Sequence, residues 1–427
     1  MRIVRALALA VLVLAVSLPA AAAPQPLGGT VRVLAVWGGS ERESFLAMVK
    51  PFEEQTGVKV EYEGTRDLNA VLTTRLQAGN PPDVAALPGP GQMAEFARQR
   101  KLIPLRDVVD VNALAQDYAS SWINLGGVEG KLYGIFVKTA LKGLIWYNPK
   151  AFARAGYTVP RSWEALLALT DRIARSEVTP WCIGLESGAA SGWPATDWIE
   201  DILLRSAGPG TYNQWVRHEI AWTHPAVKNA WQTFGRFAAN PRVVFGGRQG
   251  VLSTNFGESP FPMFTTPPRC YLHHQATFIQ DFIQKQFPQL KPVEDFAFVE
   301  FPAINPSISK AVVAAGDIFG MFRDTPQARA LMRWLVTPQA QAIWVRRGGA
   351  LSANRRVSLD AYPDALSREA ARILTTAEVV RFDGSDLMPE AVNSAFWKGT
   401  LDYVGNPSQL DQILRRIEQI ARRAYGR

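Results

Sequence analysis

The sequence predicts an α/β protein with a doubly wound parallel sheet and two lobes, and three observations support this prediction. Strand-like and helix-like segments alternate from residue 30 onward, an order typical of parallel sheets. The chain has 427 residues, more than one hydrophobic core usually supports. Its apolar share of 47% and charged share of 20% suit a packed globular protein.

The first residues have the composition of a targeting signal. Arg2 and Arg5 precede an apolar run at 6–18, and small residues follow at 20–23. This order predicts a signal peptide over residues 1–23, cut after Ala22 or Ala23, and therefore export. The apolar run is shorter than the roughly 20 residues of a transmembrane helix. The region contains no cysteine, so we expect a periplasmic protein that is not lipid-anchored through an N-terminal Cys.

The charge pattern argues against nucleic-acid binding. The formal net charge is +8, and two of the positive charges belong to the signal segment. The other Lys and Arg residues are scattered along the chain and form no basic run. A solvated surface explains them better than a nucleic-acid interface does.

The chain has two cysteines, Cys182 and Cys270. In an oxidising compartment such a pair predicts a disulfide, and the alternative is two separate buried thiols. The loop between them is about 88 residues long, for which the chain-entropy model gives a ceiling of roughly 4–5 kcal/mol.

Three strand–helix pairs open the mature chain. Strands are expected at 30–36, 58–62 and 83–87, and helices at 40–56, 67–78 and 91–97. Ser40 with Glu43 fits a capping box, and Asp67 fits a helix cap. In a parallel sheet ligands bind beyond the carboxyl ends of the strands. Those ends are 37–41, 64–67 and 88–91.

The middle and the tail continue the pattern without a flexible linker. Extended segments are expected at 131–137, 142–147 and 181–185, and a long strand at 310–322 is interrupted by Gly316 and Asp317. After the small-residue loop 186–192, a helix begins at 193–196, with Thr196 as its cap. Residues 245–269 look loop-like. Further helices are expected at 278–287, 326–344, 367–380 and 409–422.

Several segments, in order, resemble the extracellular solute-binding proteins of carbohydrate ABC importers, the class that includes maltose-binding protein. They are Phe52–Val60 (FEEQTGVKV), Gly79–Val84 (GNPPDV), Gly130–Ile135 (GKLYGI), Ala315–Asp317 (AGD), Thr325–Ala328 (TPQA) and Thr337–Gln341 (TPQAQ). The match covers essentially the whole mature chain. The ordered set is specific, although each piece is weak.

Two further segments resemble the α-glucoside-binding subgroup. The first runs from Pro180–Gly184 to Trp193–Trp198, and the second is Cys270–Gln275. This resemblance implies a ligand such as maltose, trehalose, sucrose or a glucosyl-polyol.

The family resemblance implies a type II periplasmic-binding-protein-like fold, in which crossing hinge strands join two lobes and the ligand binds between them. The first lobe would combine residues 28–137 and 316–350, and the second 142–310 and 356–427. The chain would cross near 136–141, 310–316 and 351–355. It also implies a membrane permease as partner, a monomer and no cofactor.

A sugar offers hydroxyl groups and weakly apolar ring faces, so its site needs aromatic planes and charged or amide groups. By position, the resemblance implies cleft residues Trp37, Ser40, Glu41, Arg66, Asp67, Gly89 and Pro90 in the first lobe, and Lys138, Glu186, Trp193, Asp197, His273, Asp317 and Arg355 in the hinge and second lobe. The maltose-binding pattern has a tryptophan near 267–270, where this chain reads PPRC. Tyr271 or Phe256 is the expected substitute.

Some candidates have competing structural roles. Ser40 and Asp67 are also helix caps, Trp37 fits core packing and Arg66 fits a surface turn. Lys138 and Asp317 lie in apolar segments, where a charge needs partners. His273 and His274 predict no metal site, because the chain has four histidines and no third ligand at metal spacing.

Two other functions remain as alternatives. A secreted glycosidase would use a carboxyl pair such as Glu186 and Asp197. A receptor for a polyamine, a metal chelate or a phosphorylated polyol would have a cleft of one charge sign. The mixture of cations and carboxylates among the candidates favours a neutral, hydroxyl-rich ligand.

Overall fold

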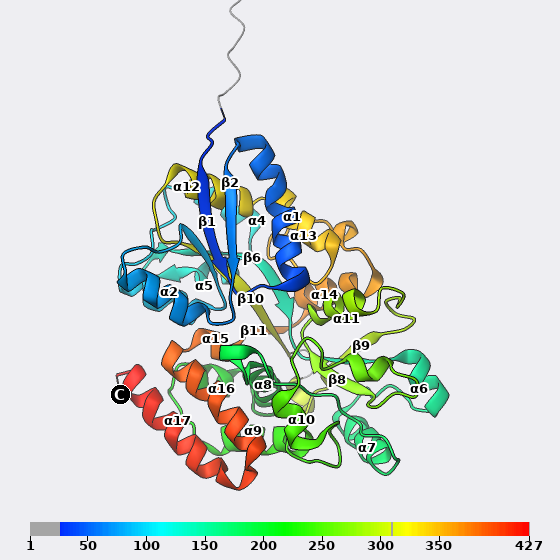
Figure 1. Cartoon of the computed structure of the whole chain (residues 1–427). Coiled ribbons are helices and arrows are strands. Elements are labelled where there is room, and N and C mark those ends of the chain that lie inside the picture. Colours follow the sequence, from blue (N-terminus) through cyan, green and yellow to red (C-terminus); the bar gives the residue numbers. More distant parts are fainter. Residues whose placement is uncertain (1–25, 309–310, 427) are drawn as a thin grey trace, which may run out of the picture.

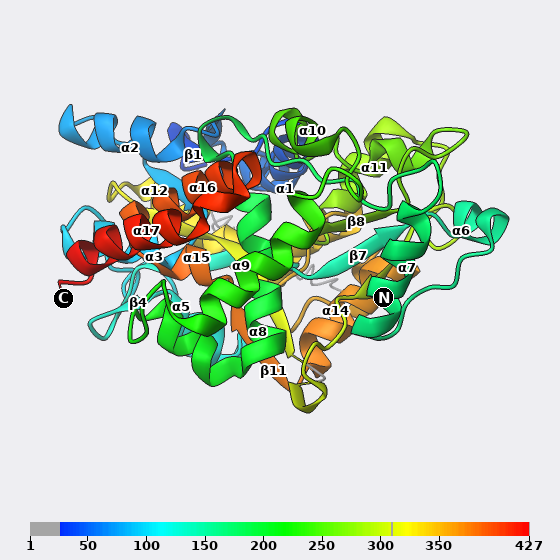
Figure 2. The same cartoon turned by 90° about the horizontal axis from the view of Figure 1, so that it is seen from below.

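The computed structural model of this protein describes residues 26–308 and 311–426. The expected signal peptide and Lys310 lie outside these residues. Figure 1 shows two halves, one above the other, and the strands β6 and β10 run between them. Figure 2 shows the lower half from below, with α16 and α17 stacked against α9.

A six-stranded sheet forms the centre of the upper half. Five of its strands follow the order β11-β10-β3-β1-β2, and β6 pairs with β10. The strands are β1 (Thr30–Ala35), β2 (Lys59–Gly64), β3 (Val84–Leu87), β6 (Gly134–Leu141), β10 (Ala311–Met321) and β11 (Val379–Phe382). β1 is parallel to β2 and β3, as predicted, but β10 is antiparallel to β3 and β6. The sheet is therefore mixed, because β10 enters it from the opposite half of the molecule.

Helices cover this sheet, and two short strands lie at its edge. They are α1 (Gly39–Thr56), α2 (Leu68–Gln77), α3 (Pro90–Arg98), α4 (Val111–Asp117), α5 (Ser120–Leu125), β4 (Gly127–Val128), β5 (Lys131–Leu132), α12 (Pro326–Leu335) and α13 (Pro338–Arg347). Gly57 ends α1 in the left-handed conformation, as its sequence predicts. The N-terminus of α1 differs from the expected capping box, because Gly38 is the N-cap and Ser40 lies inside the helix.

The lower half has a small antiparallel sheet surrounded by helices. These elements are β7 (Leu144–Tyr147), α6 (Pro149–Ala155), α7 (Trp163–Ala174), α8 (Trp193–Val216), α9 (Pro225–Ala238), α10 (Gly247–Ser253), β8 (Leu272–Gln275), α11 (Ile279–Gln286), β9 (Ala297–Glu300), α14 (Ala365–Thr376), α15 (Gly384–Leu387), α16 (Glu390–Gly405) and α17 (Leu410–Ala424). A disulfide joins Cys182 to Cys270, with 5.7 Å between their Cα atoms, so the predicted bridge is confirmed.

Several local predictions were wrong. Residues 181–185 form only isolated bridges, from Trp181 to Val244 and Leu272. The expected helix 326–344 is two helices, because the chain breaks at 336–337 and Thr337 caps α13. The expected helix 367–380 ends at Thr376, and the chain then enters β11. The loop-like stretch 245–269 contains α10.

The α8 helix also begins differently from its prediction. Gly192 is the N-cap, and the Thr196 hydroxyl donates to the Trp193 carbonyl at 2.8 Å. Thr196 therefore satisfies a carbonyl inside the first turn instead of capping the helix. Pro209 and the non-helical Gly208 bend α8 further along its length.

The buried apolar side chains form three clusters. One belongs to the upper half and combines residues from 31–137 with residues from 318–353. The second fills the lower half with tryptophans from α8 and α9 and with apolar residues of α16 and α17. The third lies around β7, the disulfide and α14. Discontinuous chain segments thus share each core, while the lobe boundaries drawn from the sequence stay a prediction.

None of the helices within 26–308 and 311–426 has the length and apolar character needed to span a membrane.

Candidate functional site

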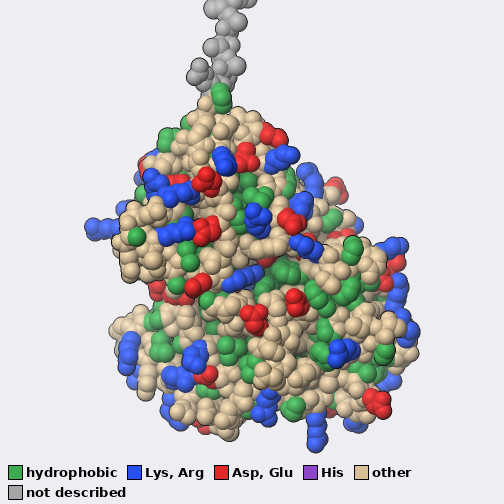
Figure 3. Space-filling view, in the orientation of Figure 1, with side chains coloured by type: hydrophobic (Ala, Val, Ile, Leu, Met, Phe, Trp, Pro, Cys, Tyr) green, Lys and Arg blue, Asp and Glu red, His purple; other side chains and the backbone are tan. Residues whose placement is uncertain are grey.

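A cavity of about 260 Å³ lies where the two halves meet. Its lining comes from the ends of β1, β2 and β3, from β6 and β10, and from α8, α15 and α16. The three predicted strand ends each contribute to it, through Trp37, Arg66 and Pro88. Figure 3 shows the waist between the halves, with charged side chains of both signs on this face. The volume is near the lower end of ordinary small-molecule sites, which is about 300 Å³.

One polar cluster in the lining is centred on Lys138 of β6. We call Glu41, Arg66, Lys138 and Asp317 the Lys138 pole. Lys138 Nζ forms ion pairs with Glu41 and, at 3.5 Å, with Asp317. Arg66 lies 3.6 Å from Glu41, and the Trp37 indole donates to Asp317 at 3.2 Å. Two cations therefore face two carboxylates, and the pole is balanced in charge.

The titration of the Lys138 pole follows from this pairing. Burial lowers the pKa of Lys138, but the charges of Glu41 and Asp317 outweigh burial and raise that pKa above its usual value. Burial raises the pKa of Asp317, and Lys138 opposes the rise. Lys138 is consequently an ammonium at neutral pH.

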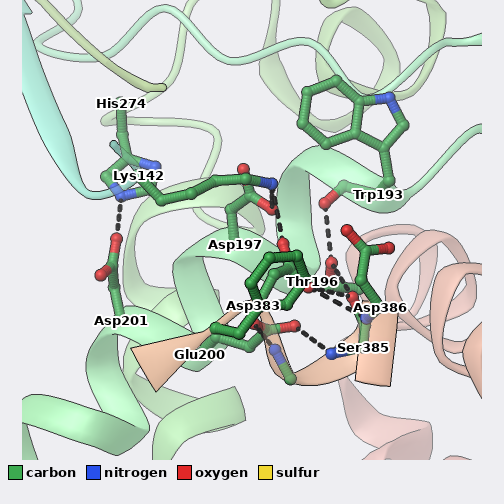
Figure 4. A network of polar contacts seen from close by, with 12 residues as sticks. Lys142, Trp193, Thr196, Asp197, Glu200, Asp201, His274, Asp383, Ser385 and Asp386 are labelled. Atoms are coloured by element: carbon green, nitrogen blue, oxygen red, sulfur yellow. Dashed lines mark hydrogen bonds and ion pairs between the residues drawn. The ribbon is translucent and has the colours of Figure 1, made fainter. Parts of the chain in front are cut away.

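A second polar cluster is centred on Lys142, in the segment between β6 and β7. We call Lys142, Asp197, Asp383 and Asp386 the Lys142 pole (Figure 4). Lys142 Nζ lies 2.7 Å from Asp197 Oδ1 and 2.8 Å from Asp383 Oδ2. Asp197 comes from the first turn of α8, Asp383 is the N-cap of α15, and Asp386 lies within α15.

The three carboxyls of the Lys142 pole differ in pKa, and Asp197 and Asp383 are the two that pair with its ammonium group. Burial and the neighbouring Asp383 raise the pKa of Asp197 to about 8, against the opposing effect of Lys142. Burial and Asp383 also raise the pKa of Asp386 well above its usual range. The pKa of Asp383 is lowered despite burial, because Lys142, the Ser385 hydroxyl and the Asp386 N–H stabilise its anion.

Aromatic rings supply the apolar part of the lining. They are Trp37, Trp193, Phe256, Phe278 and Trp397. The Trp193 ring packs at 5.2 Å from Phe256 and 5.9 Å from Phe278 between ring centroids. The buried indole nitrogen of Trp397 has no hydrogen-bond partner. These rings provide apolar planes next to both poles.

Eight of the fourteen sequence-predicted ligand residues line this cavity. They are Trp37, Glu41, Arg66, Asp67, Lys138, Trp193, Asp197 and Asp317. Asp67 is the N-cap residue of α2 but makes no side-chain cap hydrogen bond, and Phe256 lines the cavity whereas Tyr271 does not. Trp37 combines a cavity position with core packing, because it is 1% exposed and its ring lies 4.9 Å from that of Trp344.

Three other candidates lie at the upper half's strand ends but outside the lining. Ser40 is buried within α1 and hydrogen-bonds to Asp281 of α11. Gly89 packs directly on α15, since a Cβ there would meet the Asp386 carbonyl oxygen at 2.4 Å. Pro90 begins α3 and is buried.

The remaining three candidates have other partners. Glu186 accepts from the Gly188 N–H and the Asn255 amide, each at 2.7 Å, and these bonds lower its pKa. His273 donates through Nδ1 to the Cys182 carbonyl, and burial lowers its pKa to about 3. Arg355 is exposed and donates to the Tyr118 carbonyl.

Four residues that line the cavity were not predicted from the sequence: Lys142, Asp383, Asp386 and Trp397. A weak signal existed for Lys142, which is a second lysine in the same apolar segment as Lys138. Asp383 and Asp386 followed a segment that was predicted as helix, so no strand end drew attention to them. Trp397 lies on α16, in a part of the tail for which no element was predicted.

Within 26–308 and 311–426, no group of three or more His, Cys, Asp or Glu side chains is arranged to hold a metal ion.

Comparison with known proteins supplies the family. The model of the bacterial extracellular solute-binding proteins matches residues 38–342. The chain belongs to this family. This solute-binding protein is the substrate-binding component of an ABC transporter, and family membership implies a periplasmic location. Its relatives in the family are binding proteins, not enzymes.

Two relatives are each 41% identical to this solute-binding protein. One is the osmoprotective compounds-binding protein GgtB of Synechocystis sp., aligned over 390 residues that cover 91% of each chain. The other is the alpha-glucosides-binding periplasmic protein AglE of Rhizobium meliloti, aligned over 395 residues that cover 90% of this chain and 85% of AglE.

Solved structures show the same type II fold at low sequence identity. A chitin oligosaccharide binding protein gives a TM-score of 0.80 at 17% identity and covers 94% of this chain and 100% of that chain. Maltose-bound MalE3 of T. maritima gives 0.72 at 17% identity, with 92% and 98% covered. The predicted fold class is therefore confirmed.

Proposed function

We propose that this solute-binding protein captures a neutral glycoside of about disaccharide size, an α-glucoside such as maltose, trehalose, sucrose or a glucosyl-polyol, and delivers it to an inner-membrane permease. The proposal rests on one cavity whose lining combines aromatic rings with both lysine–carboxylate poles. Such a cavity matches the apolar ring faces and the hydroxyl groups of a sugar. GgtB binds osmoprotective compounds and AglE binds alpha-glucosides, and both support this ligand class.

The volume of the cavity supports a short ligand. About 260 Å³ is less than the 300–1,000 Å³ range of ordinary ligand pockets. We therefore expect one or two sugar units to fit between the halves and longer oligosaccharides to prevent closure. Closure would move the upper and lower lobes about the crossing strands, with lobes over 28–137 plus 316–350 and 142–310 plus 356–427.

The proposed protein binds without catalysing a reaction. A glycosidase would need two carboxyls around the scissile bond. Glu186, one member of the pair considered from the sequence, lies outside the cavity lining that contains Asp197. We expect bound sugar to be recovered intact, and we expect a monomeric periplasmic protein whose signal peptide is removed.

Isothermal titration calorimetry with a ligand panel tests the function. The panel contains trehalose, sucrose, maltose, glucosylglycerol and maltotetraose, with spermidine and glycerol phosphate as the competing classes. Binding of a short α-glucoside, with weaker or no binding of maltotetraose, is the expected result. Tight binding of spermidine or glycerol phosphate and no response to any carbohydrate would overturn the proposal.

A further inference from the structure

The Lys142 pole has more carboxyls than its cation can neutralise. Within the described chain, the cavity lining contains seven carboxyl side chains and three cationic side chains. Two of these cations, Arg66 and Lys138, belong to the charge-balanced Lys138 pole. Lys142 is left with Asp197, Asp383 and Asp386. If all three were ionised, the pole would hold two uncompensated negative charges, which is costly in a partly water-free site.

The contacts show which carboxyl is best stabilised as an anion next to Lys142. Asp383 Oδ2 pairs with the ammonium at 2.8 Å, while its Oδ1 accepts from the Ser385 hydroxyl at 2.8 Å and the Asp386 N–H at 3.1 Å. Three donors therefore stabilise the Asp383 anion. Neither of the other two carboxyls has a comparable set of donors among the described contacts.

Asp197 has an oxygen with no partner at all. Its side chain is 1% exposed, and Oδ1 takes the contact with Lys142 at 2.7 Å. Oδ2 is buried and makes no hydrogen bond, although Asp197 belongs to the wall of the cavity. A buried anionic oxygen without a donor is more costly than a neutral hydroxyl, and a ligand oxygen in the cavity would supply the missing partner.

We propose that Asp197 acts as a protonated carboxyl that hydrogen-bonds to the bound sugar, so that sugar affinity falls as the pH rises. This proposal rests on the proposed sugar-binding function and deepens it. A neutral acid can donate a hydrogen bond where a carboxylate can only accept one. The pole would then offer the sugar an O–H donor in addition to the Lys142 ammonium.

The charged groups that face Asp197 are Lys142 before β7, Asp383 between β11 and α15, and Glu200 and Asp201 on α8. Asp386 and Glu390 line the same cavity, and burial raises the pKa of Glu390 to about 7. Asp201 is paired with Arg205 at 2.5 Å and with His274 at 2.9 Å. The further acids of this set act in the same direction and favour proton retention at the pole.

The test measures Kd for the best sugar of the panel between pH 6 and 9. With a pKa of about 8 at Asp197, affinity should weaken by about tenfold between pH 7 and pH 9. Calorimetry in two buffers of different ionisation enthalpy should show proton uptake on binding above pH 8. Asp197→Asn keeps a neutral donor in place and should flatten this part of the profile, whereas Asp386→Asn retains Asp197 and should keep the slope.

Asp317→Asn at the Lys138 pole is the matched control. It should weaken binding at every pH while preserving the slope. An affinity that stays constant from pH 6 to 9 would overturn the inference and leave the sugar-binding function standing. An affinity that increases with pH would also overturn it and would point to a ligand that brings a cation. A slope that survives in Asp197→Asn would exclude Asp197.

A measurement without ligand separates this inference from the function. A carboxyl with a raised folded-state pKa contributes stability below its unfolded pKa near 4 and loses it as the pH rises through the folded value. Apo wild type should therefore lose thermal stability relative to Asp197→Asn between pH 6 and 9. Parallel unfolding curves would contradict protonation of Asp197, whatever the sugar titrations show.

Discussion

Lys138 and Lys142 centre two poles of the same cleft, and both ammonium groups are almost completely buried, at 5% and 6% exposure. The Lys138 pole pairs two cations with two carboxylates. In the Lys142 pole one cation pairs with Asp197 and Asp383, and a third carboxyl, Asp386, feels the charge of Lys142 without a recorded ion pair. The same residue types therefore give two different poles. In the Lys138 pole, protein side chains neutralise one another. In the Lys142 pole, protons or groups of a ligand must neutralise the excess negative charge.

Removing Lys142 should give the largest effect. Lys142→Met leaves Asp197 and Asp383 buried without their cation, which should cost about 3–5 kcal/mol of unfolding free energy at pH 8. The loss should be smaller at pH 5, where the carboxyls take up protons. Chemical denaturation at both pH values measures it. Lys398→Met removes an exposed pair with Asp402 and serves as the control, at under about 1 kcal/mol. An equal loss of unfolding free energy at pH 5 and pH 8 would contradict the excess of carboxyls over cations at the Lys142 pole.

Removing Lys138 should cost somewhat less. Arg66 stays 3.6 Å from Glu41 after Lys138→Met, so about 3 kcal/mol is expected, near the lower end for a broken buried pair. Denaturation curves at pH 5 and pH 8 should differ less than those of Lys142→Met. A double variant with Arg66→Ala should remove the remaining compensation. If Arg66→Ala causes no further loss of unfolding free energy, Arg66 does not balance the charge of the Lys138 pole.

The aromatic surface between the poles should matter for the ligand more than for folding. Trp193 is only partly buried and packs on Phe256 and Phe278. Trp193→Ala should weaken sugar binding by about 10- to 100-fold, the equivalent of roughly 1.5–3 kcal/mol of apolar contact. Calorimetry and thermal unfolding on the same sample separate the two effects. Trp37→Ala is the contrast, because Trp37 belongs to the upper core and its loss should mainly reduce stability.

The contact between Gly89 and α15 gives the smallest expected effect. A Cβ at residue 89 would come within 2.4 Å of the Asp386 carbonyl oxygen, so Gly89→Ala should displace Asp386 from the Lys142 pole. We expect sugar affinity to fall several-fold and its pH profile to change, while Gly210→Ala, with open space around it, should leave both unchanged. An unaltered Kd in Gly89→Ala would mean that the Lys142 pole tolerates this shift.

Local patterns in the sequence were strong enough to predict the first three strand–helix pairs. The apolar stripe of α1 and the left-handed Gly57 that ends it are encoded within one segment. The prediction was less accurate where one residue pattern permits two structures. Val379 and Val380 extend the apolar pattern of α14, yet they form a strand because β10 lies beside them and supplies hydrogen-bond partners.

The predicted and observed site residues divide in the same way, between those that local sequence places correctly and those that depend on packing. Trp37, Arg66 and Asp67 follow predicted strands, so their place at the carboxyl edge of the sheet was accessible from the sequence. His273 lies on β8 in the separate sheet of the lower half, and its burial against the Cys182 carbonyl is a consequence of packing. Asp383 and Asp386 reach the cleft only because β11 joins the sheet of the upper half.

The sequence by itself determined the α/β class, the family resemblance, the cysteine pair and eight of the residues that line the cavity, because these depend on local periodicity, motifs and residue chemistry. Only the tertiary structure decided how the charges are grouped. Pairing depends on which distant segments meet, and Lys142, Asp197 and Asp383 come from three such segments. Whether a carboxyl is ionised depends on those neighbours and on burial, and neither is written in its local sequence.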